Sequence, residues 1–272
     1  MKFEHTEVMN FAGAFRGMRN PLNSWAKSDS IFTISCEHEC DESAHEVASA
    51  WTRKELENLV DSNEDYDVIY EETYEEYLEW LYDNGMRFMD ADHHYYADYI
   101  GPNDMNLAKR LISGGTEHRK FLRQIMVSVD ITAPLYWWKE FDTYKVGTTA
   151  NSTSTMHKLA STPITLECFE IDDYDKAAVD EIETALPTNF VDNLISHLED
   201  LRQEYNATKD KRYWKELIRW LPNGWLQTRT VTMNYENLRS MYHQREHHKL
   251  TEWHAFCDWV KELPYAQELI IE

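Results

Sequence analysis

Residues 117–159, EHRKFLRQIMVSVDITAPLYWWKEFDTYKVGTTANSTSTMHKL, decide the fold of this chain. Residues 125–132 alternate aliphatic side chains with Met, Ser, Asp and Thr, and this period of two predicts a strand with one aliphatic face. An Ala-Pro pair ends the strand. Pro134 suits the first turn of a helix over residues 135–144, because a backbone N–H would be unpaired there anyway. Residues 147–155 are rich in Ser, Thr and Asn and predict a polar loop.

Composition indicates a globular protein with a packed core. Hydrophobic residues make up 42% of the 272, and only 8 Gly and 7 Pro argue against a disordered or linker-rich chain. The sequence has no apolar run of membrane-spanning length and no secretory leader, so we expect a cytoplasmic protein without a membrane partner. Four Cys in a chain of this length do not suggest a disulfide framework. We therefore expect residues 1–272 to form a single domain.

The formal net charge of −22 argues against duplex nucleic acid as a partner, because phosphate neutralisation needs clustered Lys and Arg. Most of the acidity lies in residues 37–92, which contain 19 acidic and 3 basic residues. Residues 43–59 and 71–88 have helical periodicity with Glu on the outer face, as in solvated helices. We therefore expect an acidic helical insertion at about residues 37–103, followed by a core helix over residues 104–112.

Two short motifs carry metal-ligating side chains. They are Cys36-Glu-His-Glu-Cys40 and Asp90-Ala-Asp-His-His94. Zinc sites usually pair two knuckles of this kind, and the remaining Cys each stand alone in the sequence. We therefore predict no metal site.

The second half of the chain adds helices. Residues 163–169 predict a short strand, and residues 209–221 predict an amphipathic helix ended by Leu-Pro-Asn-Gly. A longer amphipathic helix is expected to start at Pro187. Its predicted buried stripe is Phe190, Leu194, Ile195, Leu198 and Leu201.

A second motif follows these helices. Thr/Val alternation over residues 228–233 predicts a strand, and Asn is a good N-cap for the helix that comes next. This helix carries Asn237-x-Arg239-Ser240. Taken alone, it could be an ordinary capped surface helix with scattered basic residues.

The order of these features resembles the flavin-dependent thymidylate synthases. The shared series is a His-containing turn, the alternating strand, Ala-Pro, an aromatic helix, a Ser/Thr/Asn loop, Leu-Pro, and Asn-x-Arg-Ser, over about half the chain. The family signature Arg-His-Arg-x-x-Ser-x-Asn-Glu-x-Ser-x-Arg falls on residues 143–155. Its first three residues are Thr143-Tyr144-Lys145 here, so the guanidinium forks that bind phosphate in two-point fashion are replaced.

The resemblance implies an α+β fold with a mixed sheet and long helices. It also implies a function, the FAD-dependent transfer of a one-carbon unit to C5 of a deoxyuridine nucleotide such as dUMP. Methylenetetrahydrofolate would be the donor and NADPH the electron source, in a homotetramer. No cysteine nucleophile is required, and the protein would act by orientation and electrostatic stabilisation.

The resemblance also implies roles for individual residues. In the early segment, Arg16, Arg19 and Ser24 match a helix and a serine near the flavin. Arg245 and His248 are the candidates for contacts to the pyrimidine ring. The cofactor-binding candidates are Ser24, His118, Asn237, Arg239 and His243, and the substrate-binding candidates are Lys145, Thr148, Asn151, Ser154 and Arg219.

Two other functions remain open on the sequence. A related enzyme could act on a different pyrimidine nucleotide or add a different one-carbon group, with the altered loop setting its specificity. A catalytically silent relative could instead bind a nucleotide, or a basic partner protein through the acidic insertion. Flavin content separates the silent protein from both enzymes.

Overall fold

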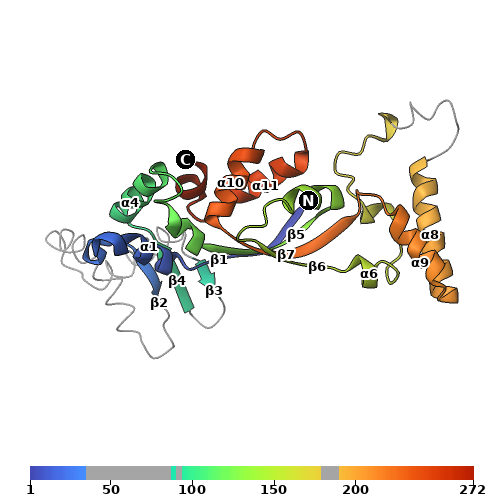
Figure 1. Cartoon of the computed structure of the whole chain (residues 1–272), viewed down its shortest axis with the longest axis horizontal. Helices are drawn as coiled ribbons and strands as arrows, with labels where there is room; N and C mark the ends of the chain where they lie inside the picture. The colour runs from blue at the N-terminus through green and yellow to red at the C-terminus, as the bar shows by residue number, and fades with distance from the viewer. Residues whose placement is uncertain (35–86, 90–93, 179–189) are drawn as a thin grey trace, which may run out of the picture. The chain divides into compact units, whose positions relative to one another are not determined.

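The structure, a computed structural model, describes residues 1–34, 87–89, 94–178 and 190–272. The chain divides into two compact units. Unit 1 contains residues 1–9 and 126–263, and unit 2 contains residues 10–125 and 264–272. Both units are assembled from segments that are distant in the sequence, as the colours in Figure 1 show.

Unit 1 is built on a four-stranded sheet with the order β1-β5-β7-β6. The strands are β1 (Lys2–Met9), β5 (Met126–Pro134), β7 (Leu226–Asn234) and β6 (Thr149–Ser152). All the described pairings are antiparallel, so the α+β class is confirmed but the predicted mixed sheet is not found. Val129 opposes Val231 in the central pair, which places the apolar rows of β5 and β7 on one face.

The alternating strand is where the sequence predicts it. Its aliphatic row, Val127, Val129 and Ile131, is at most 1% exposed. Pro134 is the last residue of β5 and the N-cap of α5 (Leu135–Phe141). This helix ends three residues earlier than predicted, because the backbone N–H groups of Thr143 and Tyr144 bond to carbonyls three residues back instead of four.

An aromatic core lies among α5, α10 (Tyr235–Arg245) and α11 (Thr251–Lys261). The ring of Trp137 lies 4.9 Å from that of Trp253 and 5.9 Å from that of Phe256, and all three side chains are fully buried. Phe3 of β1 stacks on Trp259 of α11 at 5.0 Å. These aromatic contacts join α5 and α11 to the edge strand β1 and help to hold unit 1 together.

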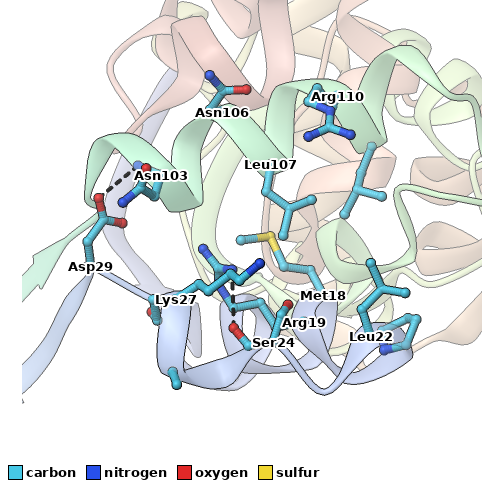
Figure 2. A pocket seen from close by; sticks show the side chains of 14 residues that line it. Met18, Arg19, Leu22, Ser24, Lys27, Asp29, Asn103, Asn106, Leu107 and Arg110 are labelled. Carbon is cyan, nitrogen blue, oxygen red and sulfur yellow. Dashed lines mark hydrogen bonds between the residues drawn. The ribbon is translucent and has the colours of Figure 1, made fainter.

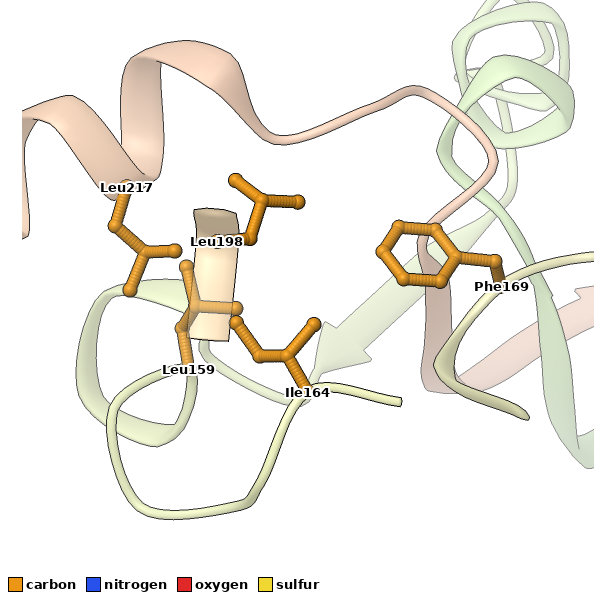
Figure 3. Close-up of a cluster of buried hydrophobic side chains, with 5 residues drawn as sticks. All are labelled: Leu159, Ile164, Phe169, Leu198 and Leu217. Atoms are coloured by element: carbon orange, nitrogen blue, oxygen red, sulfur yellow. The ribbon is translucent and has the colours of Figure 1, made fainter. Parts of the chain in front are cut away.

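A smaller cluster lies under α8 (Phe190–Thr208) and α9 (Lys211–Trp220). Figure 3 shows Leu198 and Leu217 of these helices pointing toward Leu159 and Ile164. Leu194, Ile195 and Leu201 pack against this cluster as predicted, but Phe190 is 61% exposed, so its predicted burial is wrong. Phe190 is the first residue of α8 and lies about two turns before the central contact at Leu198.

The strand predicted over residues 163–169 is also wrong. Residues Leu166–Cys168 form a 3₁₀ turn, η4, and Phe169 makes an isolated bridge to Trp225. The backbone of Ile164 donates to the Glu199 carboxylate at 2.8 Å instead of entering a ladder. A side-chain acceptor has therefore replaced the strand partner that the prediction required.

Unit 2 contains the predicted helices α1 (Phe11–Arg19) and α4 (Pro102–Ser113), with the 3₁₀ turns η1 (Asn20–Leu22), η2 (Trp25–Lys27) and η3 (Lys120–Gln124). Phe15 of α1 packs edge-on against Phe121 at 5.8 Å, and Phe11 packs against Tyr265 at 5.9 Å. Tyr265 precedes a π-helical turn, η5 (Gln267–Ile271). The far C-terminal segment therefore completes the core of unit 2.

A three-stranded antiparallel sheet in unit 2 has the order β2-β4-β3. Its strands are β2 (Ile31–Ile34), β4 (His94–Tyr99) and β3 (Arg87–Met89). Residues 87 and 88, the predicted end of an acidic helix, therefore belong to a strand, whose backbone bonds are made with β4. The rest of the predicted acidic insertion, both Cys36 and Cys40, and residues 179–189 lie outside the described residues.

Candidate functional site

The altered signature over residues 143–155 and the Asn237-x-Arg239-Ser240 motif contact each other in unit 1. The side-chain amide of Asn237 donates to the carbonyl of Val146 at 2.7 Å. Asn237 also accepts the backbone N–H of Asn234 and donates its own backbone N–H to the Asn234 side chain, which completes a capping box at the start of α10. One predicted flavin residue thus fixes both its own helix and the loop of the altered signature.

Gly147 makes this close contact possible. Its φ is +80°, a conformation that residues with a Cβ rarely adopt, and a Cβ at this position would lie 2.9 Å from Oδ1 of Asn237. Thr148 follows, and its hydroxyl donates to the carbonyl of Tyr144 at 2.5 Å. The Thr148 hydroxyl, predicted to bind substrate, therefore donates its hydrogen bond within its own turn.

The predicted polar loop over residues 147–155 is in large part ordered secondary structure, so this prediction is wrong. Its middle forms β6, where Asn151 pairs with Thr230, and Ser154 caps the short helix α6 (Thr155–Lys158) by accepting the backbone N–H of His157 at 3.3 Å. β6 is an edge strand and its four side chains are exposed. The backbone partners come from β7, which is why hydroxyl-rich residues can form a strand here.

A second cluster lies where α5, α10 and the start of α11 come together, and it is centred on Glu140. Its Oε2 accepts from Arg245 Nη1 at 2.9 Å and from Trp253 Nε1 at 3.0 Å, and lies 3.4 Å from His248 Nε2. The Arg245 guanidinium also lies over the ring of Trp253 at 4.7 Å and donates through Nε to the hydroxyl of Tyr144 at 2.8 Å. Arg245 and His248 therefore lie close together, and both contact the carboxylate of Glu140.

His248 lies beyond the end of the helix that carries Arg245. α10 ends at Arg245, and the N–H of His248 bonds to the carbonyl of Arg245 in a turn. The side chain still reaches Glu140, because the turn folds back over the helix end. His248 and Arg245 therefore converge without sharing a helical face.

The remaining predicted residues of unit 1 are more dispersed. Lys145 and His243 are exposed, and the His243 ring lies edge-on to Tyr242. Arg239 is half-buried on α10. Arg219 lies near the end of α9, where it forms an ion pair with Glu216. We find no contact that joins Arg219 to the Asn237 loop among the described residues.

Ser24 and His118 belong to unit 2, whereas the other candidates belong to unit 1. His118 is exposed and its ring lies beside Gly114, where a Cβ would be 3.1 Å from it. Ser24 lines a cleft of about 740 Å³ between the segment that follows α1 and the face of α4. The two residues do not share this cleft.

Sequence reasoning missed Glu140, Tyr144 and Trp253, which orient Arg245. Glu140 was one of two acidic residues on a predicted aromatic helix. Nothing in the spacing of the sequence links residue 140 to residue 245, so the signal could come only from the tertiary structure. A buried thiol offers no alternative chemistry, because desolvation raises the pKa of Cys257 to about 11.

The described residues contain no group of three or more His, Cys, Asp or Glu side chains that could hold a metal ion. None of the helices that the structure describes is both long enough and apolar enough to cross a bilayer.

No family model matches the sequence, and no curated protein matches it. Among solved structures, the chain is similar to the flavin-dependent thymidylate synthase ThyX of Helicobacter pylori, solved with FAD and dUMP. Two structures of that enzyme give 15% identity and TM-scores of 0.45 and 0.46. The matches cover 62% of this chain and 83% and 82% of the enzyme chains. The likeness is a distant one.

Proposed function

We propose that this protein binds FAD and a deoxyuridine nucleotide and transfers a one-carbon unit to C5 of the pyrimidine. The observation that supports the proposal most directly is the meeting of two motifs, the stretch around Val146 and the helix of Asn237, through the 2.7 Å bond between them. If the chain uses its motifs as the flavin-dependent thymidylate synthases do, these two stretches must contribute to the same site. Methylenetetrahydrofolate as donor, NADPH as reductant, a homotetramer and a cytoplasmic location belong to the same proposal.

The residues present would hold the polar edge of a flavin ring more firmly than the phosphate of the nucleotide. Asn237 retains one amide N–H after its bonds to Asn234 and Val146, and Asn amides suit polar ring edges. The cation nearest this amide along the loop is Lys145, a point charge without the forked geometry of Arg. Lys145 would therefore hold the nucleotide phosphate while Asn237 and Arg239 orient the flavin, which supplies the reducing electrons when bound.

The test combines flavin binding with turnover. The protein is loaded with FAD, freed of excess, and its visible spectrum is recorded with and without dUMP. Release of tritium from dUMP labelled at C5 then reports the loss of the C5 hydrogen that one-carbon transfer requires. Lys145→Met should weaken the dUMP response by about tenfold. Lys249→Met, which removes an equally exposed cation of unit 1, should leave it unchanged.

A second candidate is a silent protein that binds a nucleotide without catalysis. It is favoured by one observation: Glu140 forms an ion pair with Arg245 and lies 3.4 Å from His248, so the residues expected at the pyrimidine already contact a carboxylate of their own chain. Binding of dUMP, measured by isothermal titration, in a protein that retains no FAD and releases no tritium would select this candidate. A folded protein that binds neither FAD nor dUMP would overturn both.

A further inference from the structure

The cleft in unit 2 has the size and lining of a small-molecule site. Its volume of about 740 Å³ falls in the usual range for ligand pockets, roughly 300–1,000 Å³. One wall comes from α1 and the turns after it, and the other from α4. Every described residue that lines it belongs to unit 2, and Arg19 and Ser24 are the two that the sequence resemblance places near the flavin.

Three cations line this cleft, and they differ in how they are paired. Arg19 is 5% exposed and bonds through Nε to Asp104 at 2.5 Å, so its charge is neutralised inside the protein. Lys27 and Arg110 are exposed, and neither forms an ion pair with another described residue. Figure 2 shows them extending from opposite walls, Lys27 from η2 and Arg110 from α4.

Among the described residues, one acidic side chain lines the cleft, and it is already engaged. Asp29 accepts the backbone N–H groups of Asn103 at 2.7 Å and Asp104 at 3.0 Å, at the start of α4. Its negative charge is therefore directed at the positive end of that helix. In a chain of net charge −22, two unpaired cations that face one cleft form a local basic patch.

The space between the cations is apolar. Met18 and Leu107 lie between Lys27 and Arg110 in Figure 2, and Leu22 lies at the rim with 83% of its side chain exposed. An inorganic anion alone would leave this surface exposed to water. A ligand that carries both a phosphate and an apolar or planar group would cover it.

The walls are held in place by a polar network. Besides Arg19, the Asp104 carboxylate accepts the hydroxyls of Ser28 and Ser30, each at 2.5 Å. Ser30 in turn accepts the backbone N–H of Gly101 at 3.0 Å. The segment that presents Lys27 is thus fixed to the start of α4, so the distance across the cleft is set before any ligand arrives.

We propose that this cleft binds a small organic phosphate, with Lys27 and Arg110 as the phosphate ligands and Met18, Leu22 and Leu107 as the apolar surface. The proposal goes beyond the function proposed for unit 1. It depends on Lys27 and Arg110, which lie outside both motifs of that unit.

The experiment is isothermal titration of the whole chain with AMP, adenosine and inorganic pyrophosphate. AMP should bind, adenosine should bind at least tenfold more weakly, and pyrophosphate should bind with an affinity between the two. Lys27→Met and Arg110→Met should each weaken AMP binding by about tenfold, the usual effect of losing one charge-assisted contact. Raising the salt concentration should also weaken binding, because both cations are exposed.

Two variants serve as matched controls. Lys120→Met and Arg123→Met each remove an exposed cation of unit 2 that does not line the cleft, and both should leave the AMP affinity unchanged. Equal losses in the cleft and control variants would show a general charge effect and overturn the proposal. Equal binding of adenosine and AMP, or no binding of any probe by a folded protein, would overturn it as well. Loss of FAD or dUMP binding with AMP binding intact would count only against the function proposed for unit 1.

Discussion

Arg245 and Glu140, which lie 105 residues apart, form a 2.9 Å ion pair between Nη1 and Oε2. The side chains are 19% and 35% exposed, and the same carboxylate oxygen also accepts the Trp253 indole N–H. Glu140 therefore holds α5 to the end of α10 and to the start of α11. This arrangement orients the Arg245 guanidinium before any ligand is present.

Glu140→Gln should lower the free energy of unfolding by about 1–2 kcal/mol, because a charge-assisted bond becomes a neutral one in a partly buried site. Chemical denaturation measures this change. Glu117→Gln is the control, since Glu117 is 82% exposed and its oxygen lies 3.6 Å from Lys120 Nζ. If the two variants were equally stable, Glu140 would be an ordinary surface carboxylate.

Asn237→Ala should destabilise unit 1 by about 1–2 kcal/mol, because it removes half of the capping box and the bond to Val146. Asn237→Asp retains the acceptor for Asn234 but loses the donor to Val146. We expect the Ala variant to lose more stability, and both variants to show faster amide hydrogen exchange in residues 144–149. Unchanged exchange in that loop for both would argue against the bond.

Gly147→Ala tests the close approach of the loop to α10. A positive φ costs a residue with a Cβ roughly 1–2 kcal/mol, and here the new methyl would also press on Asn237. Gly115→Ala is the matched comparison, because its φ is +99° but nothing lies within 4 Å of the added Cβ. Thermal unfolding should rank Gly147→Ala as the less stable. The reverse order would mean that the Asn237 contact is loose.

Acid should weaken the α8–α9 part of unit 1 through Glu199. Hydrogen bonds from Arg202 lower the pKa of the Glu199 carboxyl from 4.5 to about 2. A carboxyl with a lowered folded-state pKa stabilises the fold above about pH 4.5, and this contribution is lost as the pH falls toward 2. Glu199→Gln should therefore flatten the dependence of stability on pH in that window, by on the order of 1–2 kcal/mol.

The control for Glu199 is Glu204→Gln, which removes an exposed carboxyl from the same helix. Its stability should follow that of the unmodified protein as the pH falls from 5 to about 2. Parallel curves for all three proteins would exclude Glu199 as the source of the pH dependence.

Asp104→Asn should destabilise unit 2 by about 3–5 kcal/mol, because it leaves the buried Arg19 charge without its counter-ion. The double variant Arg19→Met with Asp104→Leu removes both charges and should recover at least half of that loss. Chemical denaturation of the three proteins measures the difference. No recovery in the double variant would mean that the hydroxyl bonds to Asp104 matter more than the ion pair.

The elements predicted correctly are those with a clear hydrophobic periodicity or a recognisable N-cap residue. β5 follows from its alternation, and α10 follows from an Asn at its start, because these signals reflect the backbone geometry of a single element. β6 could not be predicted in this way. Thr149–Ser152 has the composition of a loop, and only the ladder that β7 provides makes it a strand.

Only part of the candidate site could be predicted, because a sequence motif identifies a residue but not its contacts with distant segments. Asn237 was found by its motif, but its bond to Val146 depends on how two distant segments fold together. Glu140 had no motif at all. The acidic character of residues 37–92 also gave no warning of the basic cleft, since Lys27 and Arg110 lie on either side of that segment in the sequence and meet only in unit 2.

The division of the chain into two interleaved units has a consequence for its synthesis. Unit 2 needs residues 264–272, because Tyr265 bonds to the backbone of Ile100 at 3.0 Å and Lys109 pairs with Glu272 at 2.8 Å. Those residues leave the ribosome only after all of unit 1 has been made. Most of unit 2 must therefore wait through the translation of more than one hundred later residues before its core can close, and a chain that ended at residue 263 would contain all of unit 1 joined to an incomplete unit 2.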